Sequence, residues 1–406
     1  MNKNPLKKIE IFNLLKKIKK IKLGKEKVSL ENSLGRFLAE DIKSKINLPP
    51  FNNSAVDGYA LFNKDLLKKK FKLVSKQRIA AGDKISDNLK SGQAARIFTG
   101  AKMPTNSSTV VMQENVLLKK DNITIKKMPF YGENCRLIGE DIKKGQIILS
   151  NQDKINITNV NIIAAIGKKN IYVKKKIKLG YFTSGNELRE PTEKLKDSEI
   201  NNSNYFSLNA LLSKTYITSK YLGVLKDKES IIIKSFTKNI NKYDVIITTG
   251  GASVGEEDHL IKIINKLGKI YFWKAAIKPG RPIAVGQIQN TIFICLPGNP
   301  VSVHLLFGMI VGPFLEYLSG GKFLPIKGIK AKTDFKMKKK NKRLEWLRVN
   351  VNKKKKDLIV SKYHKQGSGI ISSIVFADGI IEIPENVSKV SKNQLYTYYS
   401  FKNLFD

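Results

Sequence analysis

The spacing of apolar positions divides the chain into consecutive stretches of different character. Residues 1–45 carry Ile and Leu at helical intervals, which predicts an N-terminal amphipathic helix followed by further helical turns. Residues 46–139 hold short apolar runs between Gly, Asn and Asp, a pattern typical of strands and tight turns. Residues 140–173 are mixed and include the predicted helix "NITNVNIIAAIG", which ends at Gly167.

Residues 174–322 alternate apolar strands with amphipathic helices. Strands such as "YDVIITT" are followed by helices such as "DHLIKIINKLG". Helical crossovers between apolar strands predict a parallel, doubly wound α/β sheet, whose ligands bind beyond the carboxyl ends of the strands. Residues 323–406 return to short strands and turns, which predicts a small β-barrel or sandwich. The predicted fold class is therefore α/β plus β, in several domains.

The formal net charge is +40, from 74 Lys and Arg against 34 Asp and Glu. Such a charge attracts nucleic acid, anionic membranes or phosphorylated small molecules. The lysines are dispersed, however, and the dense runs at 336–343 and 352–356 have the pattern of turns between short strands. Because no aromatic residues interleave with a basic patch, we favour a compositional bias toward Lys, Ile and Asn and expect no nucleic-acid partner.

Neither a membrane span nor a secretory signal is predicted. The longest apolar stretch, "VHLLFGMIVGPFLEYL", is interrupted by glycines, a proline and a glutamate, so we expect a buried helix. The N-terminus lacks the uninterrupted apolar core of a signal peptide. Cys135 and Cys295 form no CxxC pair, which argues against a disulfide framework or a zinc site and favours a cytoplasmic location.

The loop "TTGGASVGEEDH" follows one strand and opens a helix. Gly250 and Gly255 have P-loop spacing, but no Lys-Ser/Thr follows, so a Walker A motif is excluded, and no dinucleotide fingerprint is spelled. Its glycines allow backbone N–H groups to approach an anion. The acids Glu256, Glu257 and Asp258 either favour the helix N-terminus or hold a Mg²⁺ ion against a phosphate.

Three more segments could contribute to an anion site. The loop "CLPGNPVSVHLLF" ends a strand and begins a helix with a proline, and the stretch "FWKAAIKPGRPIAVG" supplies cations around a Pro-Gly turn. The alternative is a structural turn in the first and solvated lysines in the second. Glu187, in "SGNELREP", is either a cap or a functional acid. The three histidines (His259, His304 and His364) are scattered and support no nucleophile triad.

These segments, with "PPFNNSAVDGYAL", "RIFTGAKMP", "VVMQEN" and "GED" (139–141), follow the order of one known family. The sequence strongly resembles the molybdopterin molybdenumtransferase family of the MoeA type, which is related to the E domain of gephyrin. The resemblance implies a four-domain, elongated homodimer. Its domains would be an N-terminal linker and dimerisation domain (1–45 and 140–173), an inserted β-rich domain (46–139), a MogA-like α/β molybdopterin-binding domain (174–322) and a C-terminal β-barrel (323–406).

The resemblance also implies the reaction. Family members take adenylylated molybdopterin and molybdate, usually with Mg²⁺, release AMP and leave molybdenum on the pterin dithiolene. The site would lie between the α/β domain of one subunit and the β-rich domain of the other. An adenylyltransferase and recipient molybdoenzymes would be further partners.

Position by position, the resemblance assigns roles to residues of this chain. Catalytic positions are Asp57 and Thr99, on the partner-subunit side, with Glu187, Asp227 and Asp258. Glu187 and Asp258 would also hold the metal. Substrate-binding positions are Arg136, Gly250, Gly251, Ser253, Gly255, Lys274, Lys278, Arg281, Pro297, Gly298, Asn299, Pro300 and Ser302. The chain has Asn52, Asn186 and Asn202 where acids are common in the family, which removes possible metal ligands.

Two other functions stay open from the sequence. The α/β module alone resembles the adenylyltransferases that prepare the same substrate from ATP, although such an enzyme needs neither the inserted domain nor the barrel. A scaffold protein can also evolve from this fold, as gephyrin shows. Retention of Asp57, Thr99, Glu187 and Asp258 favours an enzyme.

Overall fold

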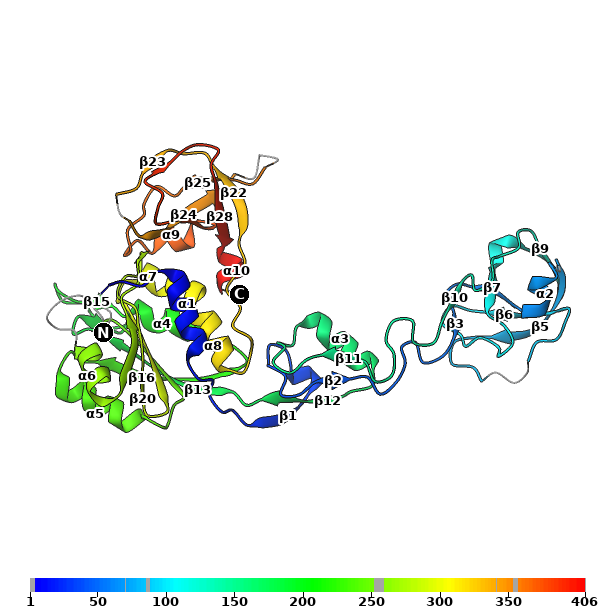
Figure 1. The fold of residues 1–406 in the computed structure, drawn as a ribbon, viewed down its shortest axis with the longest axis horizontal. Coiled ribbons are helices and arrows are strands. Elements are labelled where there is room, and N and C mark those ends of the chain that lie inside the picture. Colours follow the sequence, from blue (N-terminus) through cyan, green and yellow to red (C-terminus); the bar gives the residue numbers. More distant parts are fainter. Residues whose placement is uncertain are drawn as a thin grey trace.

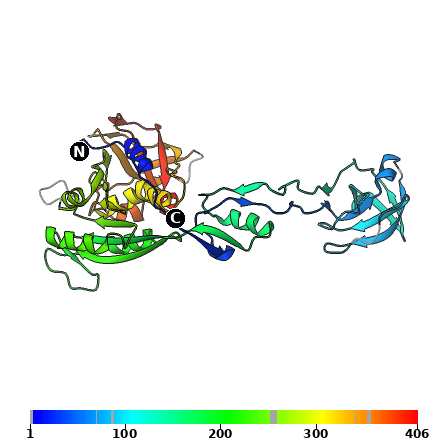
Figure 2. The same cartoon turned by 60° about the horizontal axis from the view of Figure 1, so that its bottom comes forward.

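The computed structural model describes residues 4–69, 71–84, 88–251, 259–340, 342–352 and 357–405. The chain is elongated and has three parts in a row (Figures 1 and 2). An α/β domain and a β-barrel lie together at one end, and a β-rich lobe lies at the other. A small module, which the chain crosses twice, lies between them. The boundaries at residues 45, 139, 173 and 322 stay predictions.

A six-stranded sheet in the order β16-β13-β17-β21-β20-β18 forms the centre of the α/β domain. Its strands are β13 (Ile177–Ser184), β16 (Ile217–Leu225), β17 (Val245–Thr249), β18 (Lys269–Trp273), β20 (Ala284–Ile288) and β21 (Thr291–Leu296). The first four strands in the sheet order are parallel, and β20 runs antiparallel to both of its neighbours, β21 and β18. The α/β fold class is confirmed, but the prediction of a parallel sheet is wrong for β20. Only two residues join β20 to β21, too few for a parallel crossover.

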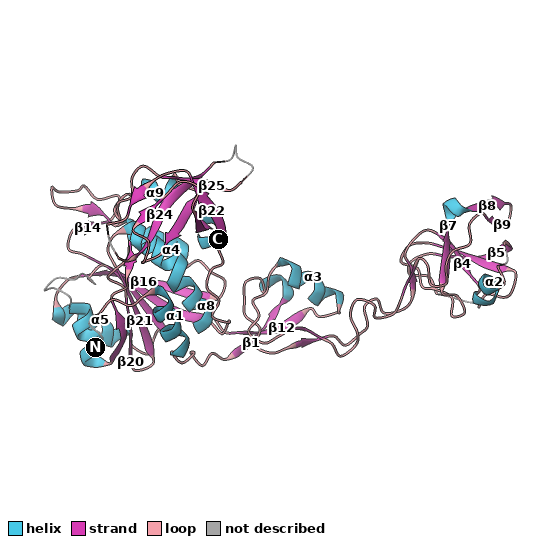
Figure 3. Cartoon of the chain, turned by 45° about the horizontal axis from the view of Figure 1, so that its top comes forward, coloured by secondary structure: helices cyan, strands magenta, loops and turns pink. Residues whose placement is uncertain are grey.

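Helices cover both faces of this sheet. They are α1 (Lys8–Lys17), α4 (Ser203–Leu211), α5 (Glu229–Asn239), α6 (His259–Leu267), α7 (Pro300–Leu306) and α8 (Gly312–Leu318), with a π-helical turn η3 (Phe307–Val311) between the last two. Helix α1 comes from the N-terminus yet lies beside α8 (Figure 3). Its Ile11, Phe12 and Leu15 are buried in the main apolar core, and the Tyr317 hydroxyl donates to the Lys16 carbonyl at 3.0 Å. The N-terminal segment is therefore part of the α/β core.

The continuous helix Pro300–Leu318 has the length and hydropathy of a membrane span, and it is the one such helix among the described residues. In this structure 78% of its apolar window is buried inside the protein. Val303, Leu306 and Phe314 belong to the main core, where they pack beneath the sheet. The prediction of a buried helix is confirmed.

The C-terminal domain is a closed β-barrel of five strands. Its strands are β22 (Ile329–Thr333), β24 (Leu344–Val351), β25 (Ile359–Lys362), β26 (Gly379–Ile383) and β28 (Leu395–Ser400); shorter elements are β23 (Met337–Lys338), α9 (Ser372–Val375), β27 (Lys389–Val390) and α10 (Phe401–Phe405). Pairing of β24 with both β25 and β26 closes the ring. A further strand, β19 (Ile277–Lys278), belongs to the α/β domain by sequence but pairs in parallel with β24.

The middle module contains two pairs of antiparallel strands and one helix. These are β1 (Lys25–Ser29) with β12 (Asn170–Lys174), β2 (Ile42–Lys43) with β11 (Ile147–Leu149), helix α3 (Ile157–Ala165) and a 3-10 turn η1 (Leu30–Asn32). The helix ending at Gly167 is confirmed, since this glycine has φ +79°. The expectation that residues 1–45 are helical throughout is wrong after α1. Pairing with β12, more than 140 residues away, overrides the local pattern.

The distal lobe is a six-stranded sheet in the order β7-β4-β6-β5-β9-β8. Its elements are β3 (Asn53–Ser54), β4 (Gly58–Leu61), α2 (Asn63–Leu67), β5 (Lys72–Ile79), β6 (Gln93–Ile97), β7 (Thr109–Met112), η2 (Gln113–Asn115), β8 (Val116–Lys119), β9 (Asn122–Ile125) and β10 (Cys135–Arg136). The predicted strand and turn character of this region is confirmed. The lobe has its own apolar core around Leu61, Leu73 and Ile123.

The packing of α5 on the sheet gives the first prediction. Phe236 is fully buried, and the centre of its ring lies 4.6 Å from the centre of the Phe293 ring. We expect Phe236→Ala to lower the free energy of unfolding of the α/β domain by about 3–5 kcal/mol, through lost burial and a residual cavity. Lys234→Ala, on the exposed face of the same helix, is the control. Urea denaturation followed by circular dichroism measures both; equal midpoints would contradict this account of the packing.

Candidate active site

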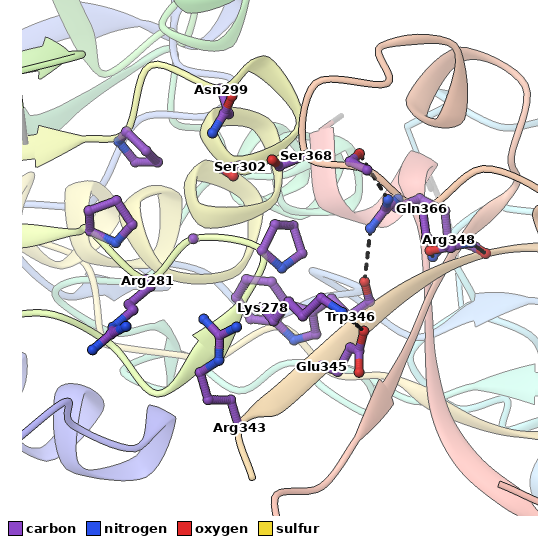
Figure 4. A pocket seen from close by; sticks show the side chains of 15 residues that line it. Lys278, Arg281, Asn299, Ser302, Arg343, Glu345, Trp346, Arg348, Gln366 and Ser368 are labelled. Atoms are coloured by element: carbon purple, nitrogen blue, oxygen red, sulfur yellow. Dashed lines mark hydrogen bonds and ion pairs between the residues drawn. The ribbon is translucent and has the colours of Figure 1, made fainter. Parts of the chain in front are cut away.

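A cavity of about 540 Å³ lies between the α/β domain and the barrel (Figure 4). The α/β domain contributes residues of two loops that the sequence singled out: Lys278, Pro279, Gly280, Arg281, Pro282, Pro297, Asn299 and Ser302. The barrel contributes Arg343, Glu345, Trp346, Arg348, Gln366, Gly367 and Ser368. Four of these side chains are cationic at neutral pH and one is acidic, so the interdomain cavity suits an anionic ligand.

The pairing of β19 with β24 positions the cations from both domains. Lys278 lies opposite Glu345 in this parallel pair, and its Nζ is 2.7 Å from a Glu345 carboxylate oxygen. The Leu344 N–H donates to the Ala276 carbonyl at 2.9 Å. The backbone around Lys278 is therefore hydrogen-bonded directly to the strand that carries Glu345, so the two side chains have fixed positions relative to each other.

Arg348 and Gln366 hold the barrel side of the cavity. Arg348 is 1% exposed, and its guanidinium donates to the Ser373 hydroxyl and to the Trp346 and Gly367 carbonyls, each at 3.2 Å. Burial lowers the pKa of Arg348 to about 10, although Glu345 acts in the opposite direction. The Gln366 side-chain amide accepts a hydrogen bond from the Arg348 N–H and donates one to the Arg348 carbonyl. These bonds fix the loop 366–368.

That loop also reaches the helix that begins at Pro300. The Val301 N–H donates to the Ser368 carbonyl at 3.2 Å, which joins the barrel to the start of α7. Burial first, and then the neighbouring Arg281, lower the pKa of Arg343. Two guanidinium groups from different domains thus repel each other across this cavity, as expected of a site that a multiply charged anion completes.

A second group of predicted residues meets at the carboxyl ends of β13, β16 and β17. The Ser184 hydroxyl donates to the Asp227 carboxylate at 2.8 Å. Gly250 and Gly251 have φ of +86° and +66°, and a Cβ at Gly250 would lie 2.3 Å from the Ser184 carbonyl oxygen. Only glycine fits there. The Glu187 side chain folds over Gly185, the residue after Ser184.

Gly298 and Asn204 connect this strand-end group to the cavity. Gly298 approaches the Cα of Gly250, which would lie 3.6 Å from an added Cβ, and the Asn204 side-chain amide donates to the Gly298 carbonyl at 2.7 Å. The other side-chain atom of Asn204, Oδ1, is buried and has no partner among the described residues, and neither has Thr249 Oγ1. Polar atoms without partners beside a glycine loop are consistent with a ligand that supplies them.

The acids at the strand ends suit a hard divalent cation. Glu187 and Asp227 provide carboxylate oxygens, the ligands that Mg²⁺ prefers, and Mg²⁺ commonly uses one or two carboxylates with substrate phosphates. Within the described ranges no group of three or more His, Cys, Asp or Glu could hold a metal by itself. Asp258, the other predicted metal ligand, lies outside the described residues, as do Ser253, Gly255, Glu256 and Glu257.

Lys274 does not line the cavity. Its ammonium group lies 3.8 Å from the centre of the Trp273 ring, and its backbone has φ +76°. The Lys274 carbonyl accepts from the Leu6 N–H at 3.0 Å, so the N-terminal segment supports the strand that leads to Lys278. Pro300 begins α7, as the sequence predicts, and is likewise a structural neighbour of the cavity.

Asp57, Thr99 and Arg136 lie in the distal lobe, apart from the cavity of the same chain (Figure 1). The Asp57 carboxylate accepts from the Thr99 N–H at 2.8 Å and from its hydroxyl at 2.7 Å. These two bonds, the backbone one first, hold the pKa of Asp57 below its ordinary value. Arg136 is on β10, which pairs with β3. One chain therefore does not bring all the predicted catalytic residues together.

The three asparagines have different environments. Asn52 accepts from the Ile138 N–H at 2.7 Å, and Asn186 is exposed at the strand end near Glu187. Asn202 is 1% exposed, caps α4 and donates to the Thr183 and Tyr221 hydroxyls at 3.0 and 3.2 Å. An aspartate could not donate these last two bonds. Asn202 is thus a structural residue whose amide is needed by the fold.

Sequence reasoning missed the barrel half of the cavity. Arg343, Arg348, Gln366 and Ser368 were not singled out, because "KMKKKNKR" has the pattern of a turn and no local motif marks the others. In "RLEWLRVN" the charged residues Glu345 and Arg348 stand within an apolar strand that is buried on both faces, and this interruption of an apolar run was the available signal. Buried charge in a strand indicates a partner or a ligand.

Comparison with known proteins identifies the family. Residues 8–167 match the model of the "MoeA N-terminal region (domain I and II)", residues 180–317 that of a "Probable molybdopterin binding domain", and residues 330–401 that of the "MoeA C-terminal region (domain IV)". These matches span most of the sequence. The chain belongs to the MoeA family.

Relatives support this membership over the whole length. The chain is 34% identical to a molybdopterin molybdenumtransferase of Haemophilus influenzae, over 93% of this chain and 94% of that protein. It is 30% identical to one of Staphylococcus epidermidis, over 93% and 91%. A crystal structure of a molybdopterin biosynthesis MoeA protein from Pyrococcus horikoshii OT3 superposes with a TM-score of 0.83 at 29% identity, covering 98% of this chain and all of that one.

A substitution at Asn202 tests whether this residue stabilises the fold or stands in place of a metal ligand. We expect Asn202→Asp to destabilise the α/β domain by about 2–4 kcal/mol, because it removes two donors and buries a carboxylate. The neighbouring Asn201→Asp is exposed and should have little effect. Thermal unfolding of both variants checks this. If Asn202→Asp keeps the wild-type melting temperature and binds Mg²⁺ more tightly, the position is a lost metal ligand instead.

Proposed function

We propose that this chain is a molybdopterin molybdenumtransferase, which transfers molybdenum from molybdate to adenylylated molybdopterin with release of AMP. The observation that carries the proposal is the cationic interdomain cavity, next to a glycine-lined strand-end site, in a member of the MoeA family. A phosphorylated pterin nucleotide and a tetrahedral oxyanion are both anions. The chain offers one anion-binding region for each.

The cavity residues would bind and orient the oxyanion. Lys278, Arg281 and Arg343 can donate charge-assisted hydrogen bonds to molybdate or tungstate, and Ser302 and Ser368 can add neutral donors. The strand-end glycines would take the phosphates of the nucleotide through backbone N–H groups. No covalent nucleophile is required, because preorganised donors stabilise the charge that develops as the anhydride bond breaks.

Magnesium is part of the proposal. Glu187 and Asp227 would hold it at the strand ends, together with Asp258. Bound there, Mg²⁺ would supply Lewis-acid stabilisation of phosphate oxygens. The protein's own contribution is to orient Glu187 over the Ser184–Gly185 turn and to keep the Asp227 carboxylate bonded to the Ser184 hydroxyl.

A homodimer would complete the site. Asp57 and Thr99 belong to the distal lobe, which lies at the opposite end of the elongated chain from the barrel and the α/β domain (Figure 2), so a partner's distal lobe would bring their counterparts to the cavity. An adenylyltransferase would supply the substrate, and molybdoenzymes would receive the product. A cytoplasmic location is consistent with the absence of a disulfide between Cys135 and Cys295 in the described structure.

The reaction itself gives the main test. Purified protein with Mg²⁺ and adenylylated molybdopterin should release AMP only when molybdate is present, and should activate a cofactor-free molybdoenzyme. Arg343→Met should raise the molybdate concentration needed for half-maximal rate by roughly 10–100-fold, since a charge-assisted bond is lost. Lys342→Met, next to it and exposed, is the control. ATP-dependent adenylylation of molybdopterin, without molybdate use, would identify an adenylyltransferase instead.

Mixing two variants tests the shared site, in an assay at a molybdate concentration too low for Arg343→Met to turn over and with Asp57→Ala expected to be inactive. Asp57→Ala and Arg343→Met affect opposite ends of the chain, so a mixed dimer has one intact site and one doubly altered site. If sites are shared, co-expression should restore about one quarter of wild-type activity. Sedimentation must show a dimer in each sample. A mixture as inactive as its components would mean that Asp57 acts within its own chain or only structurally.

A further inference from the structure

A single acidic side chain lies among the cations of the cavity. Glu345 is the one carboxylate among the described lining residues, against Lys278, Arg281, Arg343 and Arg348. Nothing in the oxyanion chemistry calls for it, because a carboxylate repels molybdate and tungstate. Its presence at this position therefore needs its own explanation.

The Glu345 side chain is enclosed, whereas the side chain of its partner Lys278 is half-exposed. The exposed fractions are 7% for Glu345 and 45% for Lys278. The strand β24 that carries Glu345 is paired on one side with β19, at Lys278, and on the other with β26, at Ile383. The Lys278 ammonium, on its flexible stem, can leave the carboxylate for a ligand, but the carboxylate cannot follow it.

The negative charge of Glu345 reaches the other cations as well. It opposes the lowering of pKa that burial imposes on Arg343, Arg348 and Lys339. In a partly desolvated site these interactions are stronger than at the surface. Glu345 thus reduces the positive potential that an entering anion meets, and it engages the Lys278 ammonium in an ion pair.

We propose that Glu345 is a specificity-determining residue, which weakens the binding of simple tetrahedral dianions by competing with them for Lys278. This inference rests on the proposed function of the cavity as the oxyanion site. Without Glu345, the cations would retain sulfate and phosphate, which have the same charge and shape class as molybdate. With it, an oxyanion stays only when further contacts, such as those to a bound pterin nucleotide, offset the loss of the ion pair.

The test is direct titration of the full-length protein with sodium molybdate, tungstate, sulfate and phosphate, by isothermal titration calorimetry. Glu345→Gln removes the charge and keeps the shape. We expect it to bind each dianion on the order of tenfold more tightly than wild type. Sulfate should then inhibit AMP release at correspondingly lower concentration. Glu345→Asp keeps the charge and should stay close to wild type, which separates charge from packing.

Glu382→Gln is the matched control. Glu382 is another largely buried barrel glutamate, it pairs with Lys8, and it does not line the cavity, so its dianion affinity should match wild type. Equal affinities in Glu345→Gln and Glu382→Gln would overturn the inference and leave the proposed function intact. Weaker binding in Glu345→Gln would also overturn it, and would show that Glu345 positions Lys278 for the anion. If no variant binds any oxyanion, the cavity assignment and this inference fail together.

Discussion

The pairing of β19 with β24 is the interaction on which the candidate site depends. Two residues of the α/β domain, Ile277 and Lys278, add a parallel strand to the rim of a closed barrel. This short pairing and the hydrogen bond from the Val301 N–H to the Ser368 carbonyl hold the two domains together on either side of the cavity. The N-terminal segment strengthens the pairing from the opposite side, since the Ala276 N–H donates to the Leu6 carbonyl at 2.7 Å. Groups far apart in sequence thereby share one rigid frame, which is what preorganised recognition of an anion requires.

The elongated shape imposes the second constraint. The chain leaves the α/β domain, crosses the middle module, builds the distal lobe and returns, so the Asp57–Thr99 pair is presented far from the chain's own cavity (Figure 1). The pair nevertheless has the arrangement of a catalytic carboxylate, because the Thr99 N–H and hydroxyl both donate to Asp57 and lower its pKa. In the proposed homodimer, a second copy of the chain would bring this pair to the cavity.

Much of the fold could be predicted from the local sequence pattern. The elements that could not be predicted are those whose conformation depends on partners far away in the sequence. The strand–loop–helix units around Gly250 and Gly298 were predictable, because positive φ, close backbone approach and a helix-starting proline each demand a particular residue type. The strand β1 was missed, because its conformation is decided by pairing with β12, which lies more than 140 residues further along the chain. The barrel side of the cavity was missed for the same reason. Arg348 and Gln366 are recognisable only after the barrel closes, which buries Arg348 and brings the Gln366 amide onto its backbone.

Charge shows most clearly what sequence and structure each contribute. A net charge of +40 spread over the surface says little about a site, since exposed lysines are screened and mobile. The few cationic side chains that the fold encloses are different, because burial strengthens their electrostatic interactions. Arg348 is held by three neutral acceptors, and Arg343 lies close enough to Arg281 to lower its pKa. Because the fold holds these cationic side chains close together and does not neutralise all of them, the cavity favours the binding of anions. The one carboxylate it retains, Glu345, determines how much of that affinity a simple dianion can use.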